Sequence, residues 1–191
     1  MAMAELPEII QLNPSLRRRV EELSGEKITA CYQCDKCTNG CPVIFAMDIV
    51  PHKLIHLLGL GYGENVLTSD TIWVCASCET CSTRCPNGID IAHVMDTLRQ
   101  LSEREGVASQ KSASRFHASF LSSIKRYGRI YEVGMIVSYI LKNEGPFGLL
   151  KWAGLGTALF KRGKVNLFPH SIKGMNQVKR IFKQAEGKGQ R

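Results

Sequence analysis

Eight cysteines are the residues of this sequence whose type and spacing point to chemistry. They form two groups of four: Cys31, Cys34, Cys37 and Cys41, then Cys75, Cys78, Cys81 and Cys85. Each group reads C-x2-C-x2-C-x3-C-P, and the second repeats the first 44 residues later. Three cysteines spaced two residues apart can wrap one side of a cubane [4Fe–4S] cluster, while the fourth lies past the loop and points elsewhere. The spacing therefore predicts iron–sulfur clusters.

The fourth cysteine of each group is expected to serve the other group's cluster, as it does in two-cluster ferredoxin runs. We therefore predict two [4Fe–4S] clusters as cofactors. Their ligands would be Cys31, Cys34, Cys37 and Cys85 for the first, and Cys75, Cys78, Cys81 and Cys41 for the second. All eight cysteines are then used, and no iron lacks a cysteine. The expected role is electron transfer, with no catalytic residue in this chain.

Other uses of cysteine fit this pattern less well. Structural zinc sites use pairs of cysteines separated by a longer gap, whereas here a run of three plus a fourth occurs twice. A disulfide framework is typical of small secreted chains, and the sequence shows no secretory signal. No histidine replaces a cysteine in either group, so a Rieske centre is excluded. His52 and His56 stand four residues apart, but the glutamate of a zinc protease motif is missing between them.

The charge of the chain is divided unevenly along its length. Residues 1–103 hold 8 Lys/Arg and 13 Asp/Glu, whereas residues 104–191 hold 17 Lys/Arg and 4 Asp/Glu, and the whole chain has a net charge of +8. The basic part also carries ten of the fourteen aromatic residues. Their helical spacing, as at Phe116 and Phe120, favours a core or a protein interface over a nucleic-acid platform. We expect this part to dock on a partner, with no role for nucleic acid.

The length and hydropathy of the chain bear on its location. It has 191 residues, of which 44% are hydrophobic. Its longest apolar stretch, from Val133 to Leu141, is far shorter than the roughly 20 residues of a spanning helix. We therefore expect a cytoplasmic protein without a transmembrane segment, although the basic aromatic part allows peripheral membrane contact.

Helical periodicity fills the sequence between and after the cysteines, so we predict an all-α fold. The expected helices are Leu12 to Leu23 with an Asn13 cap, one capped by Asp48 and ended by Gly59 and Gly61, a short one through Trp73, and one capped by Asp90. The last presents Ile91, Val94, Met95, Leu98 and Leu101 on one face. Together these predict an α-helical ferredoxin domain over residues 12–106.

The remaining residues, 107–191, are predicted to form a basic C-terminal extension. Residues 112–126 and 130–142 are expected to be helices separated by Gly128. Residues 145–191 are rich in glycine and are expected to be less regular, resting on a partner or partly mobile.

With these motifs in hand, the chain resembles the C subunit of heterodisulfide reductase. The segments that carry the resemblance are CYQCDKCTNGCP from Cys31, CASCETCSTRCP from Cys75 and the preceding SDTIW. The segment RFHASFLSSIKRYGRIYEVG from Arg115 favours this family over other iron–sulfur subunits, because the cysteine motif alone is shared with many proteins. The resemblance covers about residues 12–142 and does not extend to Gly145–Arg191.

The resemblance implies a place in a larger complex. Proteins of this kind relay electrons from a flavin- and cluster-bearing A subunit to a B subunit, which reduces a disulfide such as coenzyme M–coenzyme B. It implies that all eight cysteines are cluster ligands, and that the setting is methanogenesis or sulfur metabolism. The C-C-G domain of the disulfide-reducing B subunit is absent from this sequence, since no cysteine follows Cys85.

Two other functions remain open at this point. The chain could be the iron–sulfur subunit of a membrane-associated respiratory oxidoreductase, similar to succinate dehydrogenase or fumarate reductase. Phe147, Trp152 and Phe160 would then dock on lipid or on a membrane protein. Alternatively, the clusters could act only as a scaffold that holds the fold.

Overall fold

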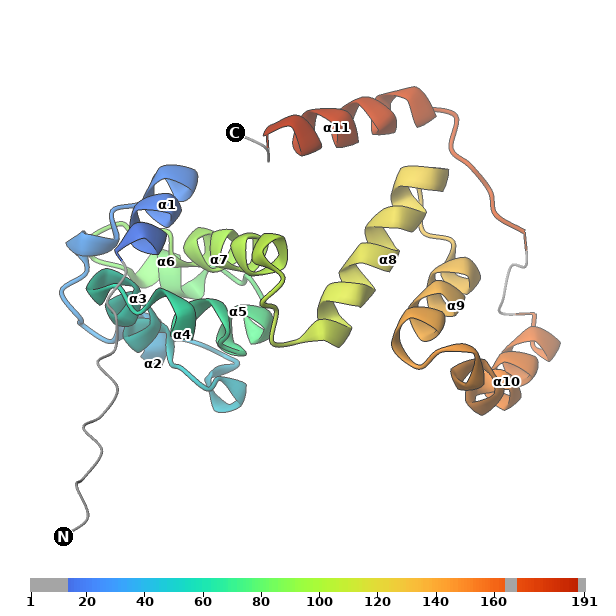
Figure 1. Ribbon diagram of the computed structural model, residues 1–191, viewed down its shortest axis with the longest axis horizontal. Helices are drawn as coiled ribbons and strands as arrows, with labels where there is room; N and C mark the ends of the chain where they lie inside the picture. Colours follow the sequence, from blue (N-terminus) through green and yellow to red (C-terminus); the bar gives the residue numbers. More distant parts are fainter. Residues whose placement is uncertain (1–13, 164–167, 189–191) are drawn as a thin grey trace, which may run out of the picture. The chain divides into compact units, whose positions relative to one another are not determined.

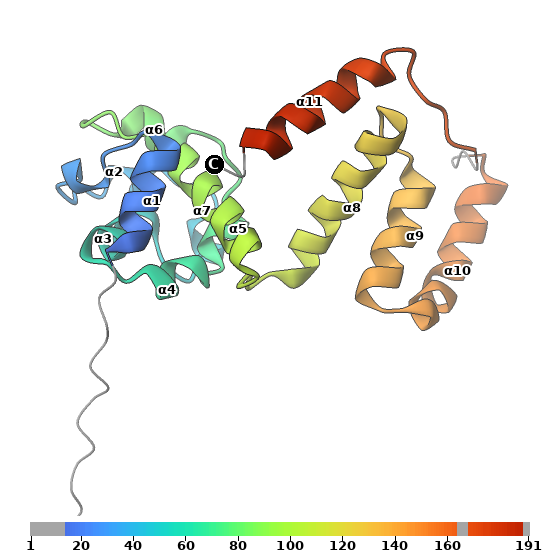
Figure 2. The ribbon, with the colours of Figure 1, turned by 45° about the horizontal axis from the view of Figure 1, so that its top comes forward.

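The computed structural model describes residues 14–163 and 168–188, and its regular elements within these ranges are all helices (Figures 1 and 2). This confirms the predicted all-α class. Eleven α-helices and two short 3₁₀ helices follow one another along these two described ranges. In order they are α1 (Ser15–Ser24), η1 (Ile28–Ala30), α2 (Lys36–Asn39), η2 (Ile44–Ala46), α3 (Pro51–Leu60), α4 (Gly63–Leu67), α5 (Thr71–Val74), α6 (Thr80–Arg84), α7 (Ile91–Glu105), α8 (Lys111–Tyr127), α9 (Glu132–Asn143), α10 (Pro146–Lys161) and α11 (Met175–Lys188).

The chain divides into two compact units between Gln110 and Lys111. The first unit holds both cysteine motifs and helices α1 to α7. The second unit holds α8 to α11 and most of the positive charge.

The core of the first unit is organised around α7. This helix presents the predicted face to the interior, with Val94, Met95, Leu98 and Leu101 at most 1% exposed. Helices α1, α4, α5 and α6 pack against it. Asp90 caps its first turn by accepting a hydrogen bond from the His93 N–H at 3.0 Å, as predicted. The period-3.6 apolar stripe therefore places the longest helix of this unit at its centre.

The ends of the shorter helices agree with the sequence in part. Pro51 occupies the first turn of α3, where its missing N–H costs nothing. Gly61 ends this helix at a positive φ of 94°, but Gly59, which was expected to help end it, lies inside it. The expected start of the first helix at Leu12, with its Asn13 cap, falls outside the described residues.

Asp48 does not cap the helix that follows it, contrary to the prediction. Helix α3 begins after Val50 without a side-chain cap. The Asp48 carboxylate instead accepts hydrogen bonds from the N–H groups of Asp70 (3.0 Å) and Thr71 (2.9 Å), at the start of α5. Its Oδ1 also lies 2.7 Å from the hydroxyl of Thr71, which is fully buried. Asp48 thus anchors the helix that leads into the second cysteine motif.

The second unit is more helical than the sequence suggested. Helices α8 and α9 confirm the two predicted near 112–126 and 130–142, and the rings of Phe116 and Tyr139 join them edge to face at 5.8 Å. The prediction of less regular structure after residue 145 was wrong, because α10 and α11 form there. Helix α10 packs beside α9, and α11 follows Ile172, whose N–H binds the carbonyl of Tyr127 at 3.1 Å. Glycines inside α10 hid its helical character.

Within the described ranges, every helix is too short or too polar to cross a membrane.

Replacing Asp48 with alanine should destabilise the first unit by about 1–2 kcal/mol. This is toward the low end for hydrogen bonds to a charged group, because the carboxylate is exposed to solvent. Chemical unfolding followed by circular dichroism under anaerobic conditions measures the change. Glu64→Ala, another exposed carboxylate in this unit, is the matched control. Equal effects of the two substitutions would contradict the anchoring role.

Candidate iron–sulfur centre

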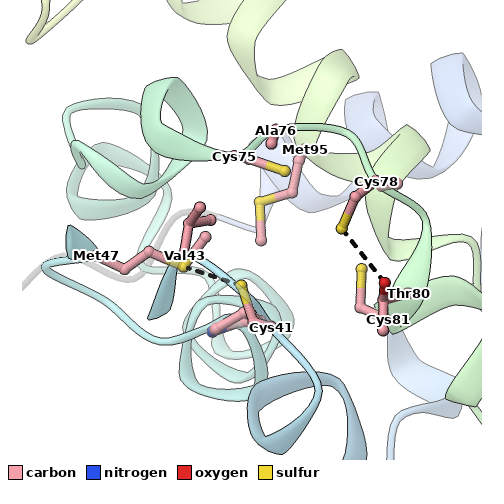
Figure 3. Close-up of a pocket in the computed structure, with 11 residues that line it drawn as sticks. Cys41, Val43, Met47, Cys75, Ala76, Cys78, Thr80, Cys81 and Met95 are labelled. Carbon is pink, nitrogen blue, oxygen red and sulfur yellow. Dashed lines mark hydrogen bonds between the residues drawn. The ribbon is translucent and has the colours of Figure 1, made fainter. Parts of the chain in front are cut away.

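Four cysteine side chains from both motifs line one cavity in the first unit (Figure 3). Cys75, Cys78 and Cys81 come from the second motif, and Cys41 comes from the first. The cavity has an empty volume of about 360 Å³, including its open mouth. The remaining lining is mostly apolar: Val43, Met47, Pro51, Ala76, Thr80, Ala92 and Met95. Four thiols facing an apolar cavity are a donor set that suits an iron–sulfur cluster.

The other four cysteines are related through Tyr32. The pKa of the Tyr32 phenol is raised, first by partial desolvation and then by the charge of Cys34 and a hydrogen bond with it. The charges of Cys85 and Cys31 raise this pKa further. Tyr32 therefore lies beside sulfurs of both motifs. Cys37 belongs to the same neighbourhood, because burial first, and the charge of Cys31 with it, raise the pKa of its thiol.

Two hydrogen bonds tie the start of the first motif to the end of the second. The side-chain amide of Asn87 donates to the carbonyl of Ala30, the residue before Cys31. Nearby, the N–H of Asp90 donates to the Glu26 carboxylate at 3.1 Å. These bonds hold the segment that carries Cys85 against the segment that enters the first motif.

The two motifs share an unusual backbone at positions 44 residues apart. Gln33 and Ser77 have φ values of 62° and 47°, and Asp35 and Glu79 have 62° and 61°. Non-glycine residues seldom occupy this left-handed region, and where they do the strain is commonly part of a functional site. No glycine in the sequence marks these four turns, so sequence reasoning missed them. These residues turn the backbone of each motif between its cysteines.

A hydroxyl in each motif holds the N-terminus of the helix that follows. Ser82 Oγ accepts from the N–H of Ala92 at 3.1 Å and donates to Asp90 Oδ1 at 2.7 Å. Its repeat-related residue, Thr38, accepts from the N–H of His52 at 3.1 Å and lies 2.8 Å from His52 Nδ1. The two motifs are thus clamped to α7 and α3 in the same way.

His52 has a structural role that the sequence did not reveal. Besides its contact with Thr38, its Nε2 lies 3.3 Å from Asp35 Oδ1 in the first cysteine loop, and its side chain is only 18% exposed.

The helices inside the two motifs, α2 and α6, pack against each other at Gly40. A Cβ atom at this position would lie 2.8 Å from Arg84 Nη1 and 2.9 Å from its Cδ. Gly40 and Arg84 occupy equivalent positions of the repeat. Because Gly40 has no side chain, the long side chain of Arg84 fits against the first motif at this point.

Arg99 supports the second motif from α7. Its Nε donates to the carbonyl of Ile72 at 2.9 Å, and its Nη2 donates to the carbonyl of Cys75 at 3.0 Å. Asp96 accepts from its Nη1 at 2.8 Å. A side chain with several donors can thus fix the backbone that enters the second motif.

The thiols differ in how readily they ionise. Burial raises the pKa of Cys75, and raises that of Cys81 to about 11. Hydrogen bonds from the Thr80 side chain and backbone lower the pKa of the exposed Cys78. Thiols with raised pKa values are protonated at neutral pH until a metal replaces their protons. Cluster binding would therefore be coupled to the release of thiol protons.

The comparison with protein families agrees with this geometry. Residues 27–89 match the family described as a 4Fe-4S dicluster domain. These residues contain all eight cysteines, and the match indicates two [4Fe–4S] clusters, as predicted.

Individual relatives identify a narrower family. The chain is 38% identical over 92 residues to the iron–sulfur C subunit 2 of CoB–CoM heterodisulfide reductase from Methanocaldococcus jannaschii, which covers 47% of this chain and 49% of that protein. It is 33% identical over 140 residues to the corresponding C subunit of Methanopyrus kandleri, which covers 73% of this chain and 69% of the relative. The C subunit of a ferredoxin:CoB–CoM heterodisulfide reductase from Methanosarcina acetivorans is 28% identical over 109 residues, covering 57% of this chain and 44% of that protein.

The matched region spans about half the length of the first of these relatives and more than two thirds of the second. The dicluster domain, the four thiols around one cavity and these relatives agree on one assignment: the chain belongs to the family of heterodisulfide reductase C subunits, which are iron–sulfur proteins.

Proposed function

We propose that this chain carries electrons between two [4Fe–4S] clusters whose ligands cross between the motifs. Cys31, Cys34, Cys37 and Cys85 would hold the first cluster, and Cys41, Cys75, Cys78 and Cys81 the second. The observation that carries this proposal is the position of Cys41, which lines the same cavity as the three cysteines of the other motif. When bound, the clusters accept and release single electrons. The protein supplies thiolates, hydrogen bonds and an apolar enclosure.

Serine substitutions at the crossed cysteines test the ligand assignment. Cys41→Ser should alter the same cluster as Cys75→Ser, and Cys85→Ser the same cluster as Cys31→Ser, because a weakened ligand perturbs only the cluster that it holds. Electron paramagnetic resonance and iron content measure these effects. Ala76→Ser, which adds a hydroxyl at the cavity without removing a thiol, is the control. If Cys41→Ser and Cys31→Ser altered the same cluster, the pairing would be wrong.

The proposed path of electrons runs from a flavin- and cluster-bearing A subunit, through this chain, to a disulfide-reducing B subunit. The relatives named for CoB–CoM heterodisulfide reductase support a thiol/disulfide couple as the final acceptor. The chain itself would be non-catalytic, because cluster binding uses all eight cysteines. A cytoplasmic setting fits this role, since a reducing compartment keeps thiols free for metal.

The second unit is proposed as the docking region for these partner proteins. Residues 111–191 hold 16 Lys/Arg and 3 Asp/Glu. Residues 150–163, which include most of α10, are all exposed. Phe147 and Leu150 are 80% and 73% exposed. Apolar side chains within a cationic unit are well suited to a protein interface with an acidic rim.

Charge reversal on α11 should weaken this docking. We expect Lys179→Glu, Arg180→Glu and Lys183→Glu together to reduce recovery of the flavin-bearing and disulfide-reducing partners with the chain, because like charges would face the partner. Iron content should not change, since no cysteine lies in this unit. Anaerobic purification with mass spectrometry of the bound proteins measures recovery. Undiminished recovery would exclude α11 from the interface.

Helix α10 supports a second candidate function, that of an iron–sulfur subunit on a membrane-associated oxidoreductase. It exposes Phe147, Leu150, Trp152 and Phe160, and Lys151 and Lys161 lie on the same helix. Apolar and aromatic side chains with nearby lysines are typical of helices that bind at an anionic membrane surface.

Liposome flotation tests this second candidate. The chain should float with vesicles of anionic lipid at physiological salt, and Phe147→Ser with Leu150→Ser should abolish flotation by removing apolar contact. Both side chains are largely exposed, so the fold should tolerate the changes. Failure of the unaltered chain to float would count against membrane association.

A further inference from the structure

Two cysteine sulfurs lie within hydrogen-bonding distance of neutral side-chain groups. Gln33 Nε2 donates to Cys31 Sγ at 3.2 Å, and Thr80 Oγ1 lies 3.4 Å from Cys78 Sγ (Figure 3). When Cys78 is a thiolate it has no proton to give, and the Thr80 hydroxyl becomes the donor. Each of the two proposed clusters therefore has one of these two donors at a ligand sulfur. Tyr32 also forms a hydrogen bond with Cys34, and the hydroxyls of Thr38 and Ser82 form hydrogen bonds with Cys37 and Cys81.

Neither donor is repeated at the equivalent position of the other motif. The residue 44 positions after Gln33 is Ser77, whose hydroxyl donates to Asp96 Oδ1 at 3.0 Å. The residue 44 positions before Thr80 is Lys36. Cysteine spacing, left-handed turns and helix clamps repeat between the motifs, whereas these hydrogen bonds to sulfur do not.

The backbone on which the donors stand is well defined. Gln33 lies between Cys31 and Cys34 with a φ of 62°. Thr80 is the first residue of α6, directly after Glu79 with a φ of 61°. Both donors thus stand between two cysteines of their motif. Ligand sulfur and donor are held two residues apart in each case.

We propose that Gln33 and Thr80 are positioning residues that set the reduction potentials of the two clusters separately. Gln33 would act on the first cluster through Cys31, and Thr80 on the second through Cys78. This proposal builds on the ligand assignment of the proposed function. It identifies one residue at each cluster through which the potential of that cluster is set independently of the other.

The physical basis is the charge that each cluster gains on reduction. One electron from an external donor adds one negative charge, part of which is borne by the ligand sulfurs. A hydrogen bond to a sulfur stabilises this charge and raises the reduction potential, so its loss lowers the potential. Because each donor faces one ligand, each should act mainly on one cluster.

Thr80→Val and Gln33→Met test the proposal in the full chain with both clusters present. Each substitution removes the donor and keeps a side chain of similar size. Potentiometric titration followed by electron paramagnetic resonance should show that Thr80→Val lowers the potential of the cluster altered by Cys41→Ser. Gln33→Met should lower the potential of the other cluster. The expected change is about threefold to tenfold in the reduction equilibrium, or about 30–60 mV at 59 mV per tenfold for one electron.

Three further variants keep the result interpretable. Thr80→Ser retains the hydroxyl and should restore the potential. Thr80→Ala removes the hydroxyl without a β-branched side chain and serves if the valine variant loses its cluster. Thr83→Val is the matched control, because this threonine stands on the same helix and its hydroxyl donates to the carbonyl of Glu79 at 3.1 Å.

Unchanged potentials in Thr80→Val and Thr80→Ala, or an equal shift in Thr83→Val, would overturn the proposal for Thr80. A shift of both clusters by each variant would overturn the separate tuning. These outcomes differ from failure of the proposed function, in which the potentials would respond as expected while no electrons reached a disulfide-reducing partner.

Discussion

The placement of Cys41, from the first motif, beside three cysteines of the second motif is the constraint on which the first unit depends. Cys41 can line the cavity of the second motif only if residues 31–41 and 75–85 lie against each other. Packing of α2 on α6 at Gly40, the bond from Asn87 to Ala30 and the anchoring of α5 by Asp48 all serve this juxtaposition. Helix α7 then supplies the apolar core against which both halves are held. A small domain with two closely placed metal sites thereby gains the cross-connections that its limited core could not supply alone.

Enclosure and ionisation of the thiols oppose each other in this site. The apolar surroundings that shield Cys75 and Cys81 also raise the pKa of their thiols, so the bare protein disfavours the anionic form that a cluster requires. Backbone and hydroxyl donors offset part of this cost, most clearly at Cys78, where they lower the pKa. Metal binding has to supply the remaining free energy needed to deprotonate the thiols. Folding of the loops and assembly of the clusters are therefore thermodynamically linked.

Much of the fold could be predicted because it follows from short-range patterns. The buried face of α7 and the Asp90 cap follow from periodicity and from a residue type with a strong positional preference. Asp48 shows where such reasoning fails. It also precedes a helix, but its carboxylate binds the backbone of a segment more than twenty residues away, and no local pattern encodes that choice. Similarly, Gln33 and Glu79 adopt a left-handed backbone conformation, which a sequence predicts only where glycine is present. The contact of His52 with Asp35 joins residues that are distant in sequence, so no local pattern indicates it. The cysteines could be predicted as cluster ligands from their spacing, whereas the groups that surround their sulfurs depend on tertiary structure.

The shared cavity also has a consequence for how the protein is made. During synthesis on the ribosome, the first motif emerges complete while the second is still absent, and Cys41 then has none of the three sulfurs with which it later lines the cavity. The cavity comes into being only once Cys81 has left the exit tunnel and α7 has begun to form behind it. Filling of this cavity therefore has to follow the synthesis of both motifs and of α7, whereas it does not require the second unit, whose residues leave the ribosome later.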